Sequence, residues 1–567
     1  MTAQTETAPA FTAWLDGFFT SYFRRCPVNA TFIGRHEYDH LLPELSPEGA
    51  AQAKRDIGDM LDRLRGLPEE SLSPAQALDR QLAEGFLEIG KWECDSPQFL
   101  HANPSVFTGE AIFGVISLFL RPYAPFDQRV ESAISRLEAV SRLLAGARAA
   151  VLSAPPEWIE RAIGECTGAL AFCARGIDLL IAESGREHPS LRAAADRAAS
   201  AFGEFREWLR TELPAGPFGD CACGSEALDR LLKRGHFLPM DAAEVEWYAE
   251  TQLEETEAYL SEHARDFGAS SPQQALLRLE EFHPSVERYY ARYAEVWDAA
   301  RQAAVDHRLL TWPEYPIEYR PQPDWAREAA PYLYFLFYRS PAPFDYPLPV
   351  DYLVTPVDGD MPVAKQNARL RAANDCVIKL NHVVHHGGLG HHTQNWHAIR
   401  SASRVGQIAA VDCASRVAMF CGGTMAEGWA CYATDLMDEI GFLTPLESYA
   451  EKHSRLRMAA RALADVRLHD GRWSLDDAAG FYREQVGMVA EAARGEAVKN
   501  SMFPGTALMY LTGTDLIHRL RQTISRREGA SFDLQRFHDR FLSYGSVPVA
   551  LVADAMQGGE QASVVDN

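Results

Sequence analysis

The stretch Asn381–His397 reads N-H-V-V-H-H-G-G-L-G-H-H-T-Q-N-W-H, and it holds six of the 18 histidines of the chain. Such clustering in a short window calls for a chemical reason. Neutral imidazole is the commonest protein ligand for zinc, and it also binds iron, copper and nickel. The stretch therefore predicts a metal site, with the candidates His382, His385, His386, His391, His392 and His397.

A helix is expected to lead into this cluster. Residues 375–386 have apolar residues at helical spacing, and no helix-breaking residue occurs before Gly387. At about 100° per residue, His382, His385 and His386 lie on one side of such a helix, three and four residues apart. The predicted helix thus presents a row of imidazoles near its C-terminal end.

Glycine interrupts the pattern directly after this helix. The segment Gly387-Gly-Leu-Gly390 disfavours a continued regular helix, because glycine is a poor helix former. In an unbroken helix His391 would lie about 120° around the axis from His385, and His392 only about 20° away. A kink at the glycines would bring His391 back toward His385, so spacing alone leaves both later histidines open as ligands.

The stretch resembles the H-E-x-x-P-G-H-H motif of the bacterial family known as domain of unknown function 885, which is similar in fold to the gluzincin metallopeptidases. In that pattern the first histidine and the histidine directly after glycine bind the metal, and a later glutamate completes the set. The resemblance implies these roles for His385, His391 and Glu427. The glutamate lies in A-E-G-W-A-C-Y-A, close to the family's E-G-W-A-x-Y. The alternative is a helix-capping group, with Thr424 as the N-cap.

Four further segments resemble the same family, in the same order along the chain. Pro27–His36 matches P-x-x-A-T-x-x-G-x-H, and Arg461–His469 matches R-x-x-x-D-x-x-x-H. Phe503–Tyr510 is similar to P-G-Q-A-x-x-Y, and Phe537–Gly545 to F-H-D-x-L-L-x-x-G. The resemblance therefore extends over most of the sequence.

The chain departs from the family motif at two positions, where His386 replaces glutamate and Leu389 replaces proline. In hydrolytic members that glutamate is the expected general base, which accepts a proton from the attacking water. His386 is open to three interpretations: a metal ligand, an acid or base in catalysis, or a passive replacement. We expect His392 to support the site without binding metal, and His382 to be a core histidine.

Two further pairs are candidates for the site. Asp465 and His469 are one helical turn apart, which suits a carboxylate that orients a catalytic imidazole, although a solvated surface pair would have the same spacing. Arg461 and Tyr510 match family positions, and either side chain can donate a hydrogen bond to a developing oxyanion or to a substrate carboxylate. We favour Tyr510 as the catalytic donor, together with His386 and His469, and place Arg461 and Asp465 in support.

Composition indicates an ordinary soluble globular protein, with 47% hydrophobic and 23% charged residues among 567. The net charge of −23 argues against nucleic acid or an anionic membrane as a partner. Residues 1–10 lack the pattern of a secretory signal, and no run of apolar residues is long enough to span a bilayer. The ten cysteines include no Cys-x-x-Cys pair, so we expect a reduced, cytoplasmic protein.

The sequence pattern predicts a mainly α, multi-helix fold, and the resemblance implies that this fold is gluzincin-like. Residues 1–310 are expected to form an N-terminal helical region, and residues 311–567 a metal-site region that acts as one functional unit. Prolines and aromatic residues dominate between Trp312 and Asp358, where Asp351–Thr355 is the best candidate strand. The resemblance implies a small sheet that holds extended substrate; a proline-rich crossover that only covers the core is the alternative.

Three functions are compatible with these patterns. The first is a zinc hydrolase of an amide or ester bond, with a non-standard base. The second is a metalloenzyme with iron or manganese, in which His386 joins the ligands and the chemistry is oxidative, lyase or isomerase. The third is an inactive binding relative. A small-molecule or short peptide-like substrate is expected, no nucleophile-elbow, Walker or dinucleotide motif occurs, and the oligomeric state has no signal in the sequence.

Overall fold

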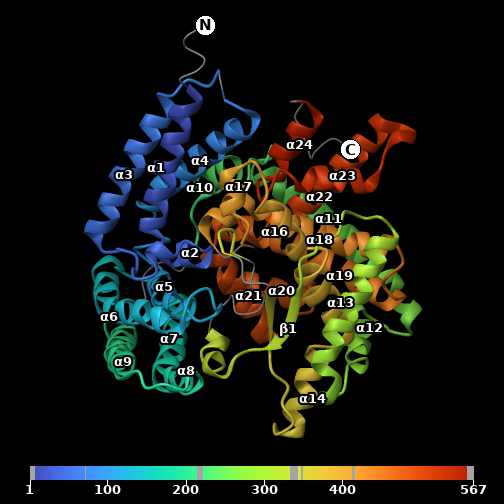
Figure 1. Ribbon diagram of the computed structural model, residues 1–567. Coiled ribbons are helices and arrows are strands. Elements are labelled where there is room, and N and C mark those ends of the chain that lie inside the picture. Colours follow the sequence, from blue (N-terminus) through green and yellow to red (C-terminus); the bar gives the residue numbers. More distant parts are fainter. Residues whose placement is uncertain are drawn as a thin grey trace. The chain divides into compact units, whose positions relative to one another are not determined.

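A computed structural model describes residues 7–70, 72–213, 221–332, 342–345, 349–411 and 415–558 (Figure 1). The described chain is mainly helical with one small sheet, which confirms the expected mainly α, multi-helix class. It divides into two compact units. Unit 1 comprises Met1–Cys223, Gln322–Leu336 and Pro341–Pro347, and unit 2 comprises Gly224–Pro321, Phe337–Ser340 and Leu348–Asn567.

Unit 1 is a bundle of helices around its own apolar core. Its helix starts are set by capping groups: the Ser46 hydroxyl accepts a hydrogen bond from the Gly49 amide, and Ser73 forms a capping box with Gln76. Helices α6 and α9 pack along one another (Figure 1). The α-helices are α1 (Thr7–Arg25), α2 (Pro27–Phe32), α3 (Pro47–Arg65), α4 (Pro74–Glu93), α5 (Ser105–Ile116), α6 (Phe126–Ala150), α7 (Pro156–Ala171), α8 (Ile177–Ser184) and α9 (Pro189–Thr211).

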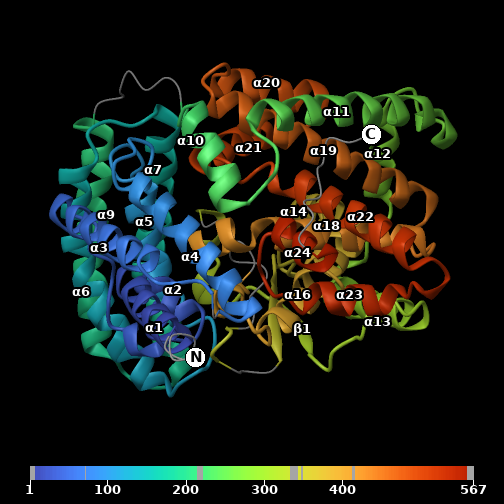
Figure 2. The ribbon, with the colours of Figure 1, turned by 90° about the horizontal axis from the view of Figure 1, so that it is seen from above.

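Unit 2 contains every residue of the expected metal site. Helices α11 and α19 run side by side (Figure 2). Its elements are α10 (Ser225–Arg230), α11 (Ala242–His263), α12 (Pro272–Leu277), α13 (Tyr289–Asp306), β1 (Ile317–Pro321), β2 (Val350–Val354), α14 (Val363–Ala372), α15 (Asp375–Val377), the π-helix η9 (Ile378–Gly387), α16 (His391–Ala398), α17 (Arg404–Ile408), the π-helix η10 (Ala418–Gly422), α18 (Gly423–Glu439), α19 (Pro445–His469), α20 (Leu475–Gln485), α21 (Ala490–Met502), α22 (Met509–Glu528), α23 (Leu534–Leu542) and α24 (Val549–Gln557).

The sheet of unit 2 consists of β1 and β2, which pair in parallel with Ile317 opposite Val350. Strand β2 confirms the strand expected at residues 351–355, shifted by one residue. Two tyrosines of this sheet reach the π-helix η9: the Tyr319 hydroxyl donates to the carbonyl of His382 over 3.2 Å, and the Tyr352 hydroxyl lies 2.7 Å from Nδ1 of the same histidine. The remaining proline-rich segments at 333–341 and 346–348 lie outside the described residues.

Helices α18 and α22 approach closely at a pair of glycines. A Cβ atom at Gly428 would lie 2.6 Å from the backbone carbon of Gly513, and one at Gly513 would collide with the carbonyl of Thr424. Only glycine at both positions allows this crossing. The crossing brings the start of α22 beside the part of α18 that carries the motif glutamate.

The expected division at residues 310 and 311 rested on a change of composition, and it stays a prediction. Both residues lie inside unit 2, where the chain leaves α13 and runs toward β1. Among the described helices, none has the length and apolar character needed to cross a bilayer.

Candidate metal centre

The histidine cluster lies at the end of a π-helix. Asn374 caps the segment through a hydrogen bond from the Val377 amide, and η9 then carries His385 and His386 in its last turn. Short π segments are frequent at functional sites, because the extra residue in the turn re-aims the side chains. The predicted helix is therefore present, but with a wider hydrogen-bond pattern than its periodicity indicated.

The chain turns sharply between η9 and α16. The amide of Gly390 donates to the carbonyl of Val384, and a Cβ atom at Gly390 would collide with the carbonyl oxygen of His385. Glycine is required here because the backbone folds back onto the helix it has just left. As a result the ring of His391 lies 4.8 Å from that of His385, measured between centroids.

Two histidines face one carboxylate. Nε2 of His385 lies 3.3 Å from Oε2 of Glu427, and Nε2 of His391 lies 3.6 Å from the same oxygen. Glu427 is in the second turn of α18 and is buried. Burial alone would raise the pKa of its carboxyl, but the charge of His391 and the hydrogen bonds of both histidines hold that pKa well below its ordinary value. The structure thus brings the three expected ligands together.

His386 completes a group of three imidazoles. Its Nδ1 lies 2.7 Å from the carbonyl of Asn381, and because a carbonyl only accepts, Nδ1 carries the proton. The lone pair of the ring is therefore on Nε2. One nitrogen of each of His385, His386 and His391 can be chosen so that all three lie within 4.8 Å of one another. Burial, followed by the charges of the other two histidines, keeps the pKa of His386 well below its ordinary value.

Cys431 lies against the far side of the His385 ring, with Sγ 4.0 Å from Nδ1. It is one helical turn after Glu427 on α18, so both side chains point the same way. A group that holds Nδ1 of a ligating histidine orients Nε2 toward the metal. Cys431 stands at the variable position of the E-G-W-A-x-Y motif, so the motif gives no signal for it.

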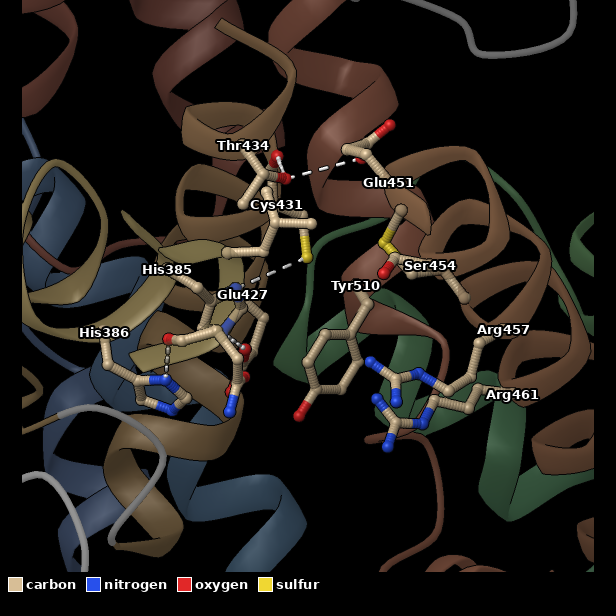
Figure 3. Close-up of a pocket in the computed structure, with 13 residues that line it drawn as sticks. His385, His386, Glu427, Cys431, Thr434, Glu451, Ser454, Arg457, Arg461 and Tyr510 are labelled. Carbon is tan, nitrogen blue, oxygen red and sulfur yellow. Dashed lines mark hydrogen bonds and ion pairs between the residues drawn. The ribbon is translucent and has the colours of Figure 1, made fainter. Parts of the chain in front are cut away.

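The site opens into a cavity of about 260 Å³, which we call the site cavity (Figure 3). Tyr510 lines it from α22, and the guanidinium of Arg461 lies over the Tyr510 ring at 4.9 Å. The Arg461 guanidinium also donates to Glu496 over 2.6 Å. The full lining is Leu380, Asn381, His385, His386, Glu427, Cys431, Thr434, Glu451, Ser454, Arg457, Met458, Arg461 and Tyr510.

Asp465 and His469 do not line the site cavity among the described residues. Both side chains are fully buried, so the alternative of a solvated surface pair is wrong. The Asp465 carboxylate accepts hydrogen bonds from the amides of Gly505, Ala507 and Leu508, at 2.8 to 3.1 Å. His469 Nε2 lies 3.0 Å from the carbonyl of Asn500 and donates to it.

The pair therefore holds backbone segments together outside the cavity lining, whereas the sequence led us to expect His469 among the catalytic residues. The hydrogen bonds of Asp465 hold the bend at Gly505 that precedes α22, and so fix the position of the first turn of that helix, which carries Tyr510. The sequence spacing placed both side chains one turn apart on one helix, as the structure has them. Which way they point depends on how α19 packs against α21 and α22.

His392 points away from the Glu427 carboxylate. Its Nε2 donates to the carbonyl of Tyr315 over 2.8 Å, and the two rings stack 4.5 Å apart. Burial lowers its pKa to about 4. A neutral imidazole held in this way supports the backbone next to His391, in agreement with the supporting position expected for it.

The chemistry of the donor set fits a divalent metal. Two imidazole nitrogens and a carboxylate oxygen are the ligands of a common type of zinc site, and a third imidazole is within reach. The carboxylate is buried, and a buried carboxylate that faces imidazoles is a typical metal-binding arrangement. His385, His391 and Glu427 would hold the ion, and His386 would lie beside it.

The chain resembles two solved structures over nearly its whole length. A "putative lipoprotein of unknown function" from Shewanella oneidensis aligns with a TM-score of 0.77 and 20% identity, over 96% of this chain and 99% of that one. A "putative lipoprotein" from Colwellia psychrerythraea aligns with a TM-score of 0.75 and 17% identity, over 97% and 98%. At this identity the likeness shows a shared fold.

No curated protein matches the chain. The family model described as "Bacterial protein of unknown function (DUF885)" matches residues 27–556, a span that includes every residue of the candidate metal centre. The chain therefore belongs to this family.

Proposed function

We propose that this protein is a metal-dependent hydrolase of an amide or ester bond, with zinc as the expected metal. One observation carries the proposal: Nε2 of His385 and Nε2 of His391 face the same oxygen of Glu427, at 3.3 and 3.6 Å, and His385 and Glu427 line a cavity. We also propose the similarity in fold to gluzincin metallopeptidases that the sequence motif implies. The expected cytoplasmic location stays a prediction.

Zinc bound by these three residues would polarise the substrate carbonyl and lower the pKa of water toward ~7. The chain itself contributes the geometry. Cys431 and Glu427 orient the His385 ring from opposite sides. The glycine turn before α16 holds His391 against them.

We assign the general base to His386. Its ring is held by the hydrogen bond from Nδ1 to the carbonyl of Asn381, so Nε2 carries no proton, and the residue lines the cavity. Nε2 accepts a proton from water as the water oxygen bonds to the carbonyl carbon. The same proton then passes to the leaving nitrogen or oxygen as its bond to that carbon breaks.

Tyr510 is the proposed donor to the developing oxyanion. It lines the cavity from the first turn of α22, and the Arg461 guanidinium over its ring favours negative charge nearby. A positioned hydroxyl donor of this kind stabilises the charge that appears on the carbonyl oxygen.

Metal content tests the proposal directly. Protein purified without added metal and then titrated with zinc is expected to bind one ion per chain, measured by elemental analysis. His385→Ala, His391→Ala and Glu427→Ala should each remove that binding, whereas His263→Ala, at a half-exposed histidine on α11, should leave it unchanged. A wild-type chain that takes up no zinc would overturn the proposal.

A second candidate is favoured by the position of His386. Because its nitrogen can lie within 4.8 Å of those of His385 and His391, it is near enough to become a fourth ligand after a small rotation. Three imidazoles and one carboxylate suit iron or manganese and non-hydrolytic chemistry on a small metabolite. X-ray absorption at the metal edge separates the two: two bound imidazoles favour the hydrolase, and three favour this alternative.

A further inference from the structure

Arg457 is a cation of the site cavity that belongs to none of the sequence motifs. It lies on α19, one helical turn before Arg461, and both arginines line the cavity. Figure 3 shows their guanidinium groups next to each other beside Tyr510, on the wall across from His385 and Glu427. The cavity thus has an imidazole and carboxylate wall and a cationic wall.

The two arginines differ in how their charge is balanced. Arg461 is paired with Glu496, and although burial would raise the pKa of that carboxyl, the charge and hydrogen bond of Arg461 lower it to about 2. Arg457 has no ion pair and no hydrogen bond with any residue that the structure describes. Burial lowers the pKa of Arg457, and the positive charge of Arg461 lowers it further.

The acidic groups of the cavity do not balance Arg457. Glu427 faces His385 and His391 on the opposite wall. Glu451 points toward Thr434, and burial together with the charge of Asp435 raises its pKa to about 8. At neutral pH the carboxyl of Glu451 is therefore largely uncharged, and the cationic wall keeps an excess of positive charge.

We propose that Arg457 binds a free carboxylate of the substrate, so that the bond cleaved is the one next to a terminal carboxylate. The guanidinium presents a planar fork of N–H donors that matches a carboxylate with two hydrogen bonds. Arg457 is half-buried, so its charge has lost part of its hydration, and a bound carboxylate would offset that loss. This inference rests on the proposed hydrolysis.

The size of the cavity limits what lies beyond the scissile bond. At about 260 Å³ it is smaller than the roughly 300–1,000 Å³ of sites for drug-sized ligands. The carboxylate-bearing product is therefore a single small residue, released from a short peptide or an N-acyl amino acid. The amide C–N bond breaks, the water oxygen bonds to the carbonyl carbon, a proton passes to the nitrogen, and the bound carboxylate is unchanged.

Matched substrates test the assignment. Zinc-loaded protein is assayed with N-acetyl-Ala-Ala and with its C-terminal amide, in the wild type, Arg457→Gln and Arg483→Gln. A charged hydrogen bond contributes enough that Arg457→Gln should lower kcat/KM for the free acid by about 10- to 100-fold and leave the poor amide substrate within threefold. The control position, on α20, is 59% exposed and outside the cavity. Equal wild-type rates on both substrates would overturn the inference.

Binding separates this inference from the proposed hydrolysis. Calorimetry with both compounds should show tighter binding of the free acid, a preference that Arg457→Gln removes and Arg457→Lys retains in part, because lysine keeps the charge but not the fork. If the preference is present without turnover, the proposed hydrolysis fails and the carboxylate site remains. If turnover occurs without the preference, the carboxylate site fails. Thermal melting of each variant checks that it is folded.

Discussion

At the scale of single residues, substitutions of His386 test whether its side chain accepts a proton or binds the metal. His386→Glu restores the carboxylate of the family motif, and we expect its hydrolysis rate to stay within tenfold of the wild type or to exceed it. His386→Ala should lower kcat by about 10²- to 10⁴-fold, the usual contribution of a general base. Both variants should bind one zinc ion, as measured by elemental analysis. Loss of zinc in His386→Ala would instead identify His386 as a ligand.

Single residues also show which parts of the site could be predicted from the sequence. The motif pointed to His385, His391 and Glu427 because their types and order are distinctive, and the structure gathers them. Arg457 and Cys431 carried no signal, since a lone arginine or cysteine on a helix is common and only the packing of α19 and α18 turns these two inward. Motif residues therefore predict which groups meet, and not which of their neighbours share the cavity.

At the scale of elements, the crossing of α18 and α22 sets the distance between Glu427 and Tyr510. Gly428→Ala would place a methyl group 2.6 Å from the backbone of Gly513, so the helices must separate. We expect a loss of about 1–3 kcal/mol in the free energy of unfolding, typical of overpacking, and a fall in kcat. Denaturant unfolding measures the first effect. Gly495→Ala, on the exposed face of α21 with open space around it, should instead be neutral or stabilising.

The elements around the histidine cluster were predicted in kind but not in detail. Apolar spacing predicted the helix of residues 375–386 and glycine predicted the break after it. The π-helix η9 was not foreseen, because a hydrogen-bond shift of one residue leaves the apolar pattern nearly unchanged. Contacts from the sheet, including the hydrogen bond from Tyr319 to the carbonyl of His382, accompany this wider helix, and such contacts are not encoded in local sequence.

At the scale of the whole molecule, buried histidines make stability depend on pH. Burial lowers the pKa of five of them to between about 3 and 4, so they stay neutral in the folded chain and take up protons on unfolding below about pH 6.5. Depressed pKa values of this kind stabilise the fold above the unfolded value and lose that contribution as the pH falls. The five are His236, His382, His392, His397 and His538.

Three buried acids act in the opposite direction. Burial raises the pKa of Glu110 and Asp465 to about 7 and that of Glu451 to about 8, so they release protons on unfolding. Between about pH 4.5 and 5.5, where the unfolded histidines are mostly protonated, these groups together take up about two protons on unfolding, five minus three. In that pH range these eight groups alone should therefore lower the free energy of unfolding by about 3 kcal/mol per pH unit on acidification.

Denaturant unfolding of zinc-free protein at several pH values measures this slope. His538→Gln should reduce it by about one proton whatever its effect on absolute stability, because one titrating group is gone. His263→Gln, at a half-exposed position, should leave the slope unchanged. A stability that increases on acidification would show that the buried acids outweigh the histidines.

Zinc should stabilise the two compact units unequally, because all proposed ligands lie in unit 2. A metal that binds only the folded state adds about 2.7 kcal/mol at a free concentration of 100 times Kd. Hydrogen exchange with and without zinc should show slower exchange in η9, α16 and α18, and no change in α6 and α9 of unit 1. His385→Ala should abolish the difference. Equal protection of both units in the wild type would mean that zinc acts elsewhere than at the histidine cluster.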